Sequence, residues 1–309
     1  MLFHRNADTS SARLWPFTAR FIQAEERLAR SVDGKAAWVS WLYEFLCFGF
    51  KQGWACLFGG IMVALLIATK LWYPAGWPVA RYDFLFIGAI LLQAGLIAVR
   101  LETLDEAKVI LLFHVVGTAM EIFKTSAGSW TYPEPSLMRI GSAPLFAGFM
   151  YAAVGSYLAR VWRLFDFRFT HHPPIWAAIL LSAGIYVNFF AHHYTQDFRL
   201  ALFAFTALLF GRTTVYFKVW RVHRRMPLLL GFLLVSLFIW FAENIGTATG
   251  TWLYPHQTRE WSMVPFAKLG AWFLLMIISY VMIAALNRPQ PILPQGKMRP
   301  AMKPDSVQA

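Results

Sequence analysis

The sequence predicts an all-α, polytopic transmembrane helix bundle with about eight spans, built from two parallel four-helix repeats. Three observations support this fold class. The 309 residues are 58% hydrophobic and 14% charged, with a mean hydropathy of +0.49, whereas soluble domains carry about 25% charged residues. Apolar runs long enough to cross a bilayer recur along the chain. A motif of 13 residues also occurs twice, 122 residues apart, which indicates an internal duplication.

Residues 1–53 are expected to form a cytoplasmic amphipathic segment ahead of the transmembrane domain at 54–287. Apolar residues, among them Leu14 and Phe21, share one face of a helix over residues 13–31, and arginines lie on the other faces. This pattern suits a helix that lies on the membrane surface. A soluble cap over the inner loops is the alternative.

Eight apolar stretches of the transmembrane domain are expected to be helical. The first half, 54–165, is expected to hold helices at about 54–73, 84–99, 109–127 and 143–163. The second half, 174–287, is expected to hold helices at about 174–193, 198–217, 226–249 and 265–287. A basic turn is expected at 218–225, and the Pro-rich residues 288–309 are expected to form a disordered cytoplasmic tail. Four helices are an even number, so both halves would have the same orientation in the membrane.

Lysine and arginine predict the orientation of the bundle. Twenty of the 28 Lys and Arg residues fall in the segments that share a side with the N-terminus, and seven fall in the opposite loops. The positive-inside rule then places both termini in the cytoplasm. The net charge of +12 is therefore a sign of topology and not of nucleic-acid binding, and membrane lipids are the expected partners. The sequence makes no prediction of oligomeric state.

The duplicated motif reads E-x-x-x-T-x-x-G-x-W-x-Y-P, at 121–133 and again at 243–255. Its glutamates, Glu121 and Glu243, lie inside apolar runs, where a carboxyl is unfavourable unless it is paired, protonated or functional. The Glu, Thr and Gly positions share one helix face if the helix continues. The Gly then allows close helix approach or ends the helix as a cap. The W-x-Y-P portion suits an interfacial aromatic belt.

Glu121 and Glu243 are the candidate catalytic acid and base. Lys124, three residues after Glu121, is a potential partner that would keep Glu121 ionised, whereas Gly246 occupies the matching place after Glu243. Glu243 is therefore the preferred proton donor, since carboxyls with different pKa values divide acid and base roles. In the alternative interpretation, both carboxyls are hydrogen-bonded between helices and only lock the bundle.

The stretch N-F-F-A-H-H-Y-T-Q-D-F-R at 188–199 is the second candidate site. It is interpreted as a polar lining or a proton-handling group. The alternatives are a plain surface loop and a metal site, because His192, His193 and Asp197 have metal-ligand-like spacing. No H-x-x-x-H, H-E-x-x-H, Walker A or G-x-G-x-x-G pattern occurs, so no metal or cofactor is predicted. The predicted substrate-binding residues from the motif and from this stretch are Thr125, Trp130, Tyr132, Asn188, His192, His193, Thr247, Trp252 and Tyr254.

The segments M-E-I-F-K-T-S-A-G-S-W-T-Y-P and F-A-E-N-I-G-T-A-T-G-T-W-L-Y-P, with N-F-F-A-H-H-Y, resemble the bacterial membrane proteins grouped as domain of unknown function 817. The resemblance would cover most of residues 40–287. It implies a protein integral to the bacterial cytoplasmic membrane and no particular activity. The helix ends are also similar to those of carotenoid-modifying hydratases and cyclases, although the P-x-E-E type motif of the cyclases is absent.

Three functions of different class fit these features. The first is an intramembrane enzyme that acts on an apolar lipid or isoprenoid, where placed carboxyls and aromatic walls stabilise a cationic intermediate. The second is a transporter of a small solute or lipid, with the paired glutamates at the repeat interface. The third is a non-catalytic membrane scaffold in which the motif only packs helices.

Overall fold

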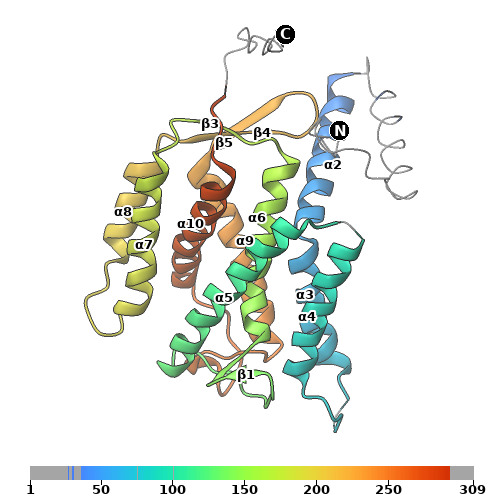
Figure 1. Ribbon diagram of the computed structural model, residues 1–309, viewed down its shortest axis with the longest axis vertical. Coiled ribbons are helices and arrows are strands. Elements are labelled where there is room, and N and C mark those ends of the chain that lie inside the picture. The colour runs from blue at the N-terminus through green and yellow to red at the C-terminus, as the bar shows by residue number, and fades with distance from the viewer. Residues whose placement is uncertain (1–26, 28–29, 31–35, 75, 100, 293–309) are drawn as a thin grey trace, which may run out of the picture.

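The computed structural model describes residues 27, 30, 36–74, 76–99 and 101–292. The helices of this part of the chain, in order, are α2 (Ala37–Ala55), α3 (Leu57–Trp72), α4 (Arg81–Ala98), α5 (Leu104–Ser126), α6 (Phe146–Leu164), α7 (Ile175–Ala191), α8 (Arg199–Phe210), α9 (Leu228–Ala248) and α10 (Ala267–Asn287), with a short 3-10 helix, η1 (Pro255–Gln257). They form one bundle (Figure 1). The predicted surface helix at 13–31 lies outside the described residues, apart from residues 27 and 30.

The protein is an integral membrane protein, because several of these helices are long and apolar enough to cross a bilayer. Among the described residues these are α4, α5, α9 and α10, and α2 with α3 makes a fifth span if this pair, bent by 65°, counts as one. Helices α7 and α8 are apolar but shorter, and the 12 residues of α8 extend only about 18 Å. Each of the eight predicted segments contains a helix, but the prediction of eight full spans exceeds the four or five that length and composition support.

Five short strands accompany the helices. Strands β1 (Arg139–Ile140) and β2 (Ala143–Pro144) form a small hairpin after α5. Strands β3 (Arg168–Thr170), β4 (Thr214–Lys218) and β5 (His223–Pro227) form an antiparallel sheet in the order β3-β4-β5. Figure 1 shows this sheet at one end of the bundle, called the sheet end below, and β1 at the other.

The sheet corrects two predictions. The helix predicted over 198–217 ends at Phe210, because T-V-Y-F-K is rich in β-branched and aromatic residues and pairs with both neighbouring strands. The predicted basic turn is part of the β4–β5 hairpin, in which Lys218 lies opposite His223. The predicted tail also begins in an ordered form, since Ile292 N–H donates to Phe169 O at 3.1 Å. The remainder of the tail lies outside the described residues.

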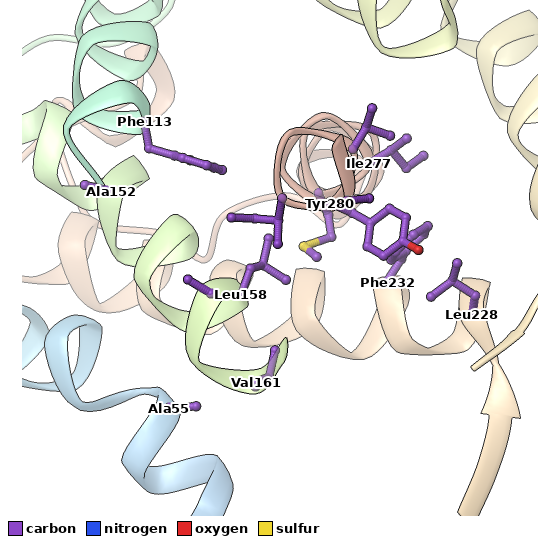
Figure 2. Packing of buried hydrophobic residues seen from close by; sticks show 14 of the residues in the cluster. Ala55, Phe113, Ala152, Leu158, Val161, Leu228, Phe232, Ile277 and Tyr280 are labelled. Carbon is purple, nitrogen blue, oxygen red and sulfur yellow. The ribbon is translucent and has the colours of Figure 1, made fainter. Parts of the chain in front are cut away.

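The core lies where α6, α9 and α10 pack together (Figure 2). Helix α6 is the central helix, with 12 of its 19 residues buried. Its Leu158 belongs to the same apolar cluster as Ile277 of α10. Across α9 and α10, the rings of Phe232 and Tyr280 lie 4.9 Å apart. This core fixes the relative positions of the helices that carry the two motifs.

Glycines let α5 and α6 approach closely along their length. A Cβ at Gly117 would lie 2.5 Å from the Tyr151 ring, and a Cβ at Gly155 would lie 2.7 Å from the Phe113 ring. Each aromatic ring therefore occupies the space that a side chain on the opposite helix would need. As a result, Tyr151 extends across α5 one turn before Glu121.

Buried charges hold the sheet end of the bundle together. Lys51 of α2 donates to Leu164 O at 3.1 Å and to Val219 O at 2.8 Å, so its ammonium binds the carbonyl end of α6 and the start of the β4–β5 turn. Arg160 and Glu102 form an ion pair of 2.7 Å with both side chains 1% exposed. Lys51 is thus held by backbone carbonyls, and Arg160 is held by Glu102 and by Trp54 O, so these charges serve to join helices.

Candidate functional site

The first motif copy ends α5 with a glycine cap. Gly128 has a φ of 70°, in the left-handed region that favours glycine. Its N–H donates to Thr125 O at 3.2 Å, and Ser129 N–H donates to Lys124 O at 2.9 Å. These two bonds are those of a Schellman motif, which satisfies the last carbonyls of the helix. The motif glycine is thus a cap and not a point of close helix approach.

The second copy ends α9 in the same way. Gly250 has a φ of 66°. The two bonds of its cap are Gly250 N–H to Thr247 O at 2.9 Å and Thr251 N–H to Gly246 O at 3.0 Å. The motif threonines support the helix ends and not the carboxyls, since Thr125 Oγ1 donates to Glu121 O at 2.7 Å and Thr247 Oγ1 donates to Asn244 O at 3.1 Å.

Beyond the caps, the two motif loops pair with each other. Thr131 N–H donates to Leu253 O and Leu253 N–H donates to Thr131 O, both at 2.9 Å, in an antiparallel bridge. Side chains alternate along an extended chain, so the Trp and Tyr that flank each bridging residue point the same way. The end of the bundle that holds this bridge is called the motif end below.

Glu121 is buried and accepts three hydrogen bonds. Its Oε2 accepts from Trp130 Nε1 and Tyr132 OH, both at 2.8 Å. Its Oε1 accepts from Tyr151 OH of α6 at 2.9 Å. Two of the donors come from its own motif loop, so the carboxyl fixes the loop against α5 and α6. The donors also satisfy both oxygens, as a buried carboxyl requires.

Glu243 is also buried, with a different set of donors. Tyr254 OH of its own motif donates to Oε1, and Trp272 Nε1 of α10 donates to Oε2 at 2.5 Å. Trp252, the counterpart of Trp130, packs instead over Gly246, where a Cβ would lie 2.0 Å from its ring. The two copies therefore share their backbone form but not the bonding of their tryptophans.

The donors of the two glutamates contact one another. The rings of Trp130 and Tyr254 meet edge to face with centroids 6.0 Å apart, and those of Tyr151 and Trp272 lie 6.3 Å apart. Two aromatic pairs thus connect Glu121 with Glu243. The motifs form one joined network and are not two independent helix ends.

A cavity of about 400 Å³ lies beside this network, between α5, α7 and α10. Trp130 and Tyr254 form part of its wall, but neither glutamate lines it. Its apolar lining includes Ile185, Phe189 and Leu274. The volume lies within the range of small-molecule pockets, ~300–1,000 Å³. Each glutamate is therefore linked to the cavity by an aromatic residue that it binds, Trp130 for Glu121 and Tyr254 for Glu243.

Three cationic side chains line the cavity: Lys124, Arg199 and Lys268. The lining residues in the described chain include no Asp or Glu. The ammonium of Lys268 lies 4.3 Å from the Tyr254 ring centroid and 5.4 Å from that of Trp130, in reach of a cation–π interaction with each. The cavity is therefore electropositive, and its aromatic wall orients one of the charges.

The interpretation of Lys124 as the partner of Glu121 is wrong. Its Nζ lies 2.8 Å from His193 Nε2 and 3.4 Å from His192 Nε2, and 4.2 Å from the Phe189 ring centroid. An ammonium only donates, so the histidine nitrogens accept. Partial burial, aided by the charge of Lys124, lowers the pKa of His193 from its ordinary value of 6.5 and keeps the ring neutral.

Arg199 is held by the loop between α7 and α8. Its Nε donates to Asp197 Oδ2 at 2.5 Å, and Asn188 Nδ2 donates to Asp197 Oδ1 at 3.2 Å. Burial disfavours the charged carboxylate, but the hydrogen bonds from Asn188 and Arg199 outweigh it and lower the pKa of Asp197. Asp197 is thus ionised and pairs with Arg199, whereas neither Lys124 nor Lys268 forms an ion pair within the described residues.

The structure divides the predicted site residues into two groups. Trp130, Asn188, His192 and Tyr254 line the cavity, and His193 contacts its Lys124. The others lie in the supporting network, namely Glu121, Glu243, Thr125, Tyr132, Thr247 and Trp252. No three His, Cys, Asp or Glu side chains of the described residues gather as a metal ion would require.

Sequence reasoning missed Lys268 and Arg199. Each sits in the first turn of an apolar helix, at the same level as the motifs. A lysine within an apolar run is a signal of the same kind as the glutamates. The sequence carries this signal at Lys268, which lies in an apolar run. Arg199 follows a polar stretch and has the appearance of an ordinary loop charge.

The chain is similar to a described family over most of its length. The family described as "Protein of unknown function (DUF817)" matches residues 44–280. The uncharacterized protein YoaT of Bacillus subtilis (strain 168) is 42% identical over 245 residues, which are 79% of this chain and 92% of that protein.

Two crystal structures of MvINS, a mycobacterial Insig homolog from Mycobacterium vanbaalenii, are also similar. One is a cross-linked trimer, with 15% identity and a TM-score of 0.41. The other has 16% identity and a TM-score of 0.40. Each match covers 61% of this chain and 98% of the matched chain.

Proposed function

The chain belongs to the DUF817 family of proteins of unknown function, and we propose that it binds a small anion in the cavity as the recognition step of membrane transport. The observation that carries this proposal is the charge of the lining: Lys124 and Lys268 face the cavity beside the paired Arg199, and no carboxylate lines it among the described residues. Charges interact more strongly in such a half-buried, largely apolar site than in water. A ligand with a phosphate or carboxylate group would supply the negative charge that pairs with these lysines.

The glutamates are positioning residues in this proposal. A general acid or base must come within hydrogen-bond reach of its substrate. Glu121 and Glu243 do not line the cavity, and their oxygens accept bonds from Trp and Tyr side chains. This disfavours the intramembrane enzyme with Glu121 and Glu243 as acid and base. Instead, the carboxyls hold Trp130 and Tyr254 where Lys268 contacts both rings.

The scaffold function explains the network but not the cavity beside it. A motif that only packed helices would have no need of lysines facing an apolar space of about 400 Å³. Transport also agrees with the predicted duplication, since transporter sites commonly lie between repeats. With both termini in the cytoplasm, as the Lys and Arg bias predicts, the cavity lies toward the outer leaflet.

Anion-dependent stabilisation of the purified protein tests the binding step. In a neutral detergent, butyl phosphate and butyrate should raise the apparent melting temperature, since a ligand that binds only the folded state stabilises it. Uncharged butanol should not. Lys268→Gln should raise the half-maximal concentration about tenfold or more, in line with the loss of one charged contact. Lys70→Gln is the matched control, because Lys70 is an exposed cation of the motif end outside the cavity.

Equal stabilisation by butanol, or an unchanged response in Lys268→Gln, would contradict anion recognition. Uptake of labelled butyl phosphate into proteoliposomes then tests transport itself. Wild type should admit it faster than protein-free vesicles, and Lys268→Gln should slow it. Binding without any uptake would restrict the function to recognition.

A further inference from the structure

A second cavity lies between α7 and α8, on the lipid-facing edge of the bundle. Its volume is about 420 Å³, and all eight residues that line it are apolar. Figure 1 shows α7 and α8 as a pair at one side of the molecule. We call this second cavity the α7–α8 groove. Alone, an apolar groove in a membrane protein only indicates lipid contact.

The groove and the cationic cavity share no lining residue, but they lie next to each other along both helices. On α7, Ile185 lines the cationic cavity, and Leu181, four residues earlier, lines the groove. On α8, Arg199 lines the cationic cavity, and Leu202, three residues later, lines the groove. Residues three and four apart are neighbours on one helix face. The groove therefore begins about one turn, ~5 Å, from the cationic cavity on each helix.

The order of the two spaces along α7 and α8 matches that of the head and the chain of a membrane lipid. The cationic cavity lies at the motif end, where α7 finishes and α8 starts, and the groove runs from there along both helices toward the sheet end. Charged groups stay near the bilayer surface, and apolar chains lie in its interior. Gly184 also leaves room in the groove, because a Cβ there would only reach ordinary contact with Leu202, at 3.6 Å.

We propose that one ligand occupies both spaces: an anionic amphiphile, with its phosphate or carboxylate head in the cationic cavity and its alkyl chain in the α7–α8 groove. This rests on the proposed function, since the head binds by the charges described there. It adds the substrate class, because a small hydrophilic anion would leave the groove unused. The alkyl chain of the ligand gains no hydrophobic energy when it moves from the bilayer into the groove. The head therefore directs binding, and the groove selects the chain.

A photoreactive ligand tests the placement. The probe is a long-chain alkyl phosphate with a diazirine at the end of its chain, added to the full-length protein in phosphatidylcholine nanodiscs. Mass spectrometry should find labelled peptides from α7 and α8. Lys268→Gln should reduce this labelling at least tenfold, whereas Lys70→Gln should not. The matched long-chain alcohol should label the groove much less than the phosphate.

Filling the groove gives a second measurement. Gly184→Leu places a side chain in the groove and should reduce labelling by the long-chain phosphate, while butyl phosphate still stabilises the protein as in wild type. Gly60→Leu is the control, since Gly60 is an exposed glycine of α3 with open space around its Cα. Gel filtration of each variant checks that it remains folded.

The outcomes separate the two proposals. Groove labelling that is equal for the alcohol, or unchanged by Lys268→Gln, would mean ordinary lipid contact and would overturn the amphiphile assignment. Butyl phosphate binding with the long-chain label elsewhere would also overturn it but leave anion recognition intact. If neither phosphate bound, the proposed function itself would fail.

Discussion

Glu121 and Glu243 are buried carboxyls satisfied by aromatic donors and not by a salt bridge. Trp130 Nε1 can only donate, so Glu121 is its acceptor whatever the protonation state of the carboxyl. Two further phenol groups complete the set on this glutamate. This bonding explains why a Glu is compatible with an apolar run. It also means that the Glu121 carboxyl holds Trp130 in its position in the cavity wall.

Substitution of Glu121 separates a positioning role from acid–base chemistry. Glu121→Leu leaves three donors without an acceptor and should destabilise the protein by at least about 2 kcal/mol, seen as a lower apparent melting temperature. Glu121→Gln keeps an acceptor for Trp130 and Tyr132, and its amide can donate to Tyr151. It should therefore remain within about 1 kcal/mol of wild type and retain butyl phosphate binding.

Glu260→Gln is the control, because Glu260 is an exposed loop residue at the same end of the bundle. It should change neither the apparent melting temperature nor butyl phosphate binding. Butyl phosphate uptake that is lost in Glu121→Gln, with folding unchanged, would instead favour a titrating role. A Glu121→Leu protein as stable as wild type would show that the hydrogen bonds to this carboxyl carry no net energy.

At the scale of single residues, the sequence predicts where the candidate site lies but not which side chains contact each other. Polar residues within apolar runs predict a site at the motif and at the N-F-F-A-H-H stretch. The structure brings both segments to one end of the bundle. The partner of Lys124 was assigned by spacing along α5, but the histidines approach from α7. Contacts between helices depend on tertiary packing, which the spacing within one helix does not contain.

At the scale of the element, the motif is a helix-ending device used twice. The caps of α5 and α9 have the same two bonds, and the loops that leave them meet in the bridge between Thr131 and Leu253. The geometry that the two copies share comes from the glycine and its backbone. The side chains then differ, since Trp130 binds a carboxyl and Trp252 packs on Gly246.

Gly128→Ala tests the cap by backbone conformation alone. A Cβ at Gly128 would meet nothing within 4 Å, so any effect comes from the φ of 70°. An L-residue there should destabilise the helix end by about 1 kcal/mol, measured as a lower apparent melting temperature. Gly60→Ala, in the interior of α3, should have the opposite sign, because alanine is the better helix former. Two changes of the same sign would contradict this account of the cap.

The sequence predicts the helices of the bundle but none of its short strands. Long apolar runs located the helices within a few residues, as in α9 and α10. The strands β4 and β5 were missed because T-V-Y-F-K continues an apolar helix, and the basic residues after it look like an inner turn. Tertiary pairing with β3 decides the outcome for this stretch.

At the scale of the whole molecule, family membership and the helical membrane bundle are confirmed. The number of spans, the four-helix repeats, the domain boundaries and the orientation stay predictions. Both ends of the described chain lie at the sheet end, since Glu44 of α2 pairs with Arg224 and Pro291 bridges Phe169. The motif end is therefore the opposite face, and the charge bias predicts that this face lies outside the cell.

Cysteine labelling tests this orientation. In a variant without Cys47 and Cys56, a single cysteine at Leu137, which is 90% exposed, should react with a membrane-impermeant maleimide in intact cells. A single cysteine at Val222, in the β4–β5 turn and 53% exposed, should react only after permeabilisation. The reverse result would invert the topology and place the cavity at the cytoplasmic side.

The bridge between Thr131 and Leu253 is self-complementary, because each residue gives and takes the same bond. Two copies of a single motif would form it equally well across a two-fold axis. A half-length ancestor with one motif would thus already hold the contact needed to dimerise at this end. Under the predicted duplication, gene fusion would then have added no new interaction there. It would have let each copy change alone, which would account for the different bonding of the two tryptophans.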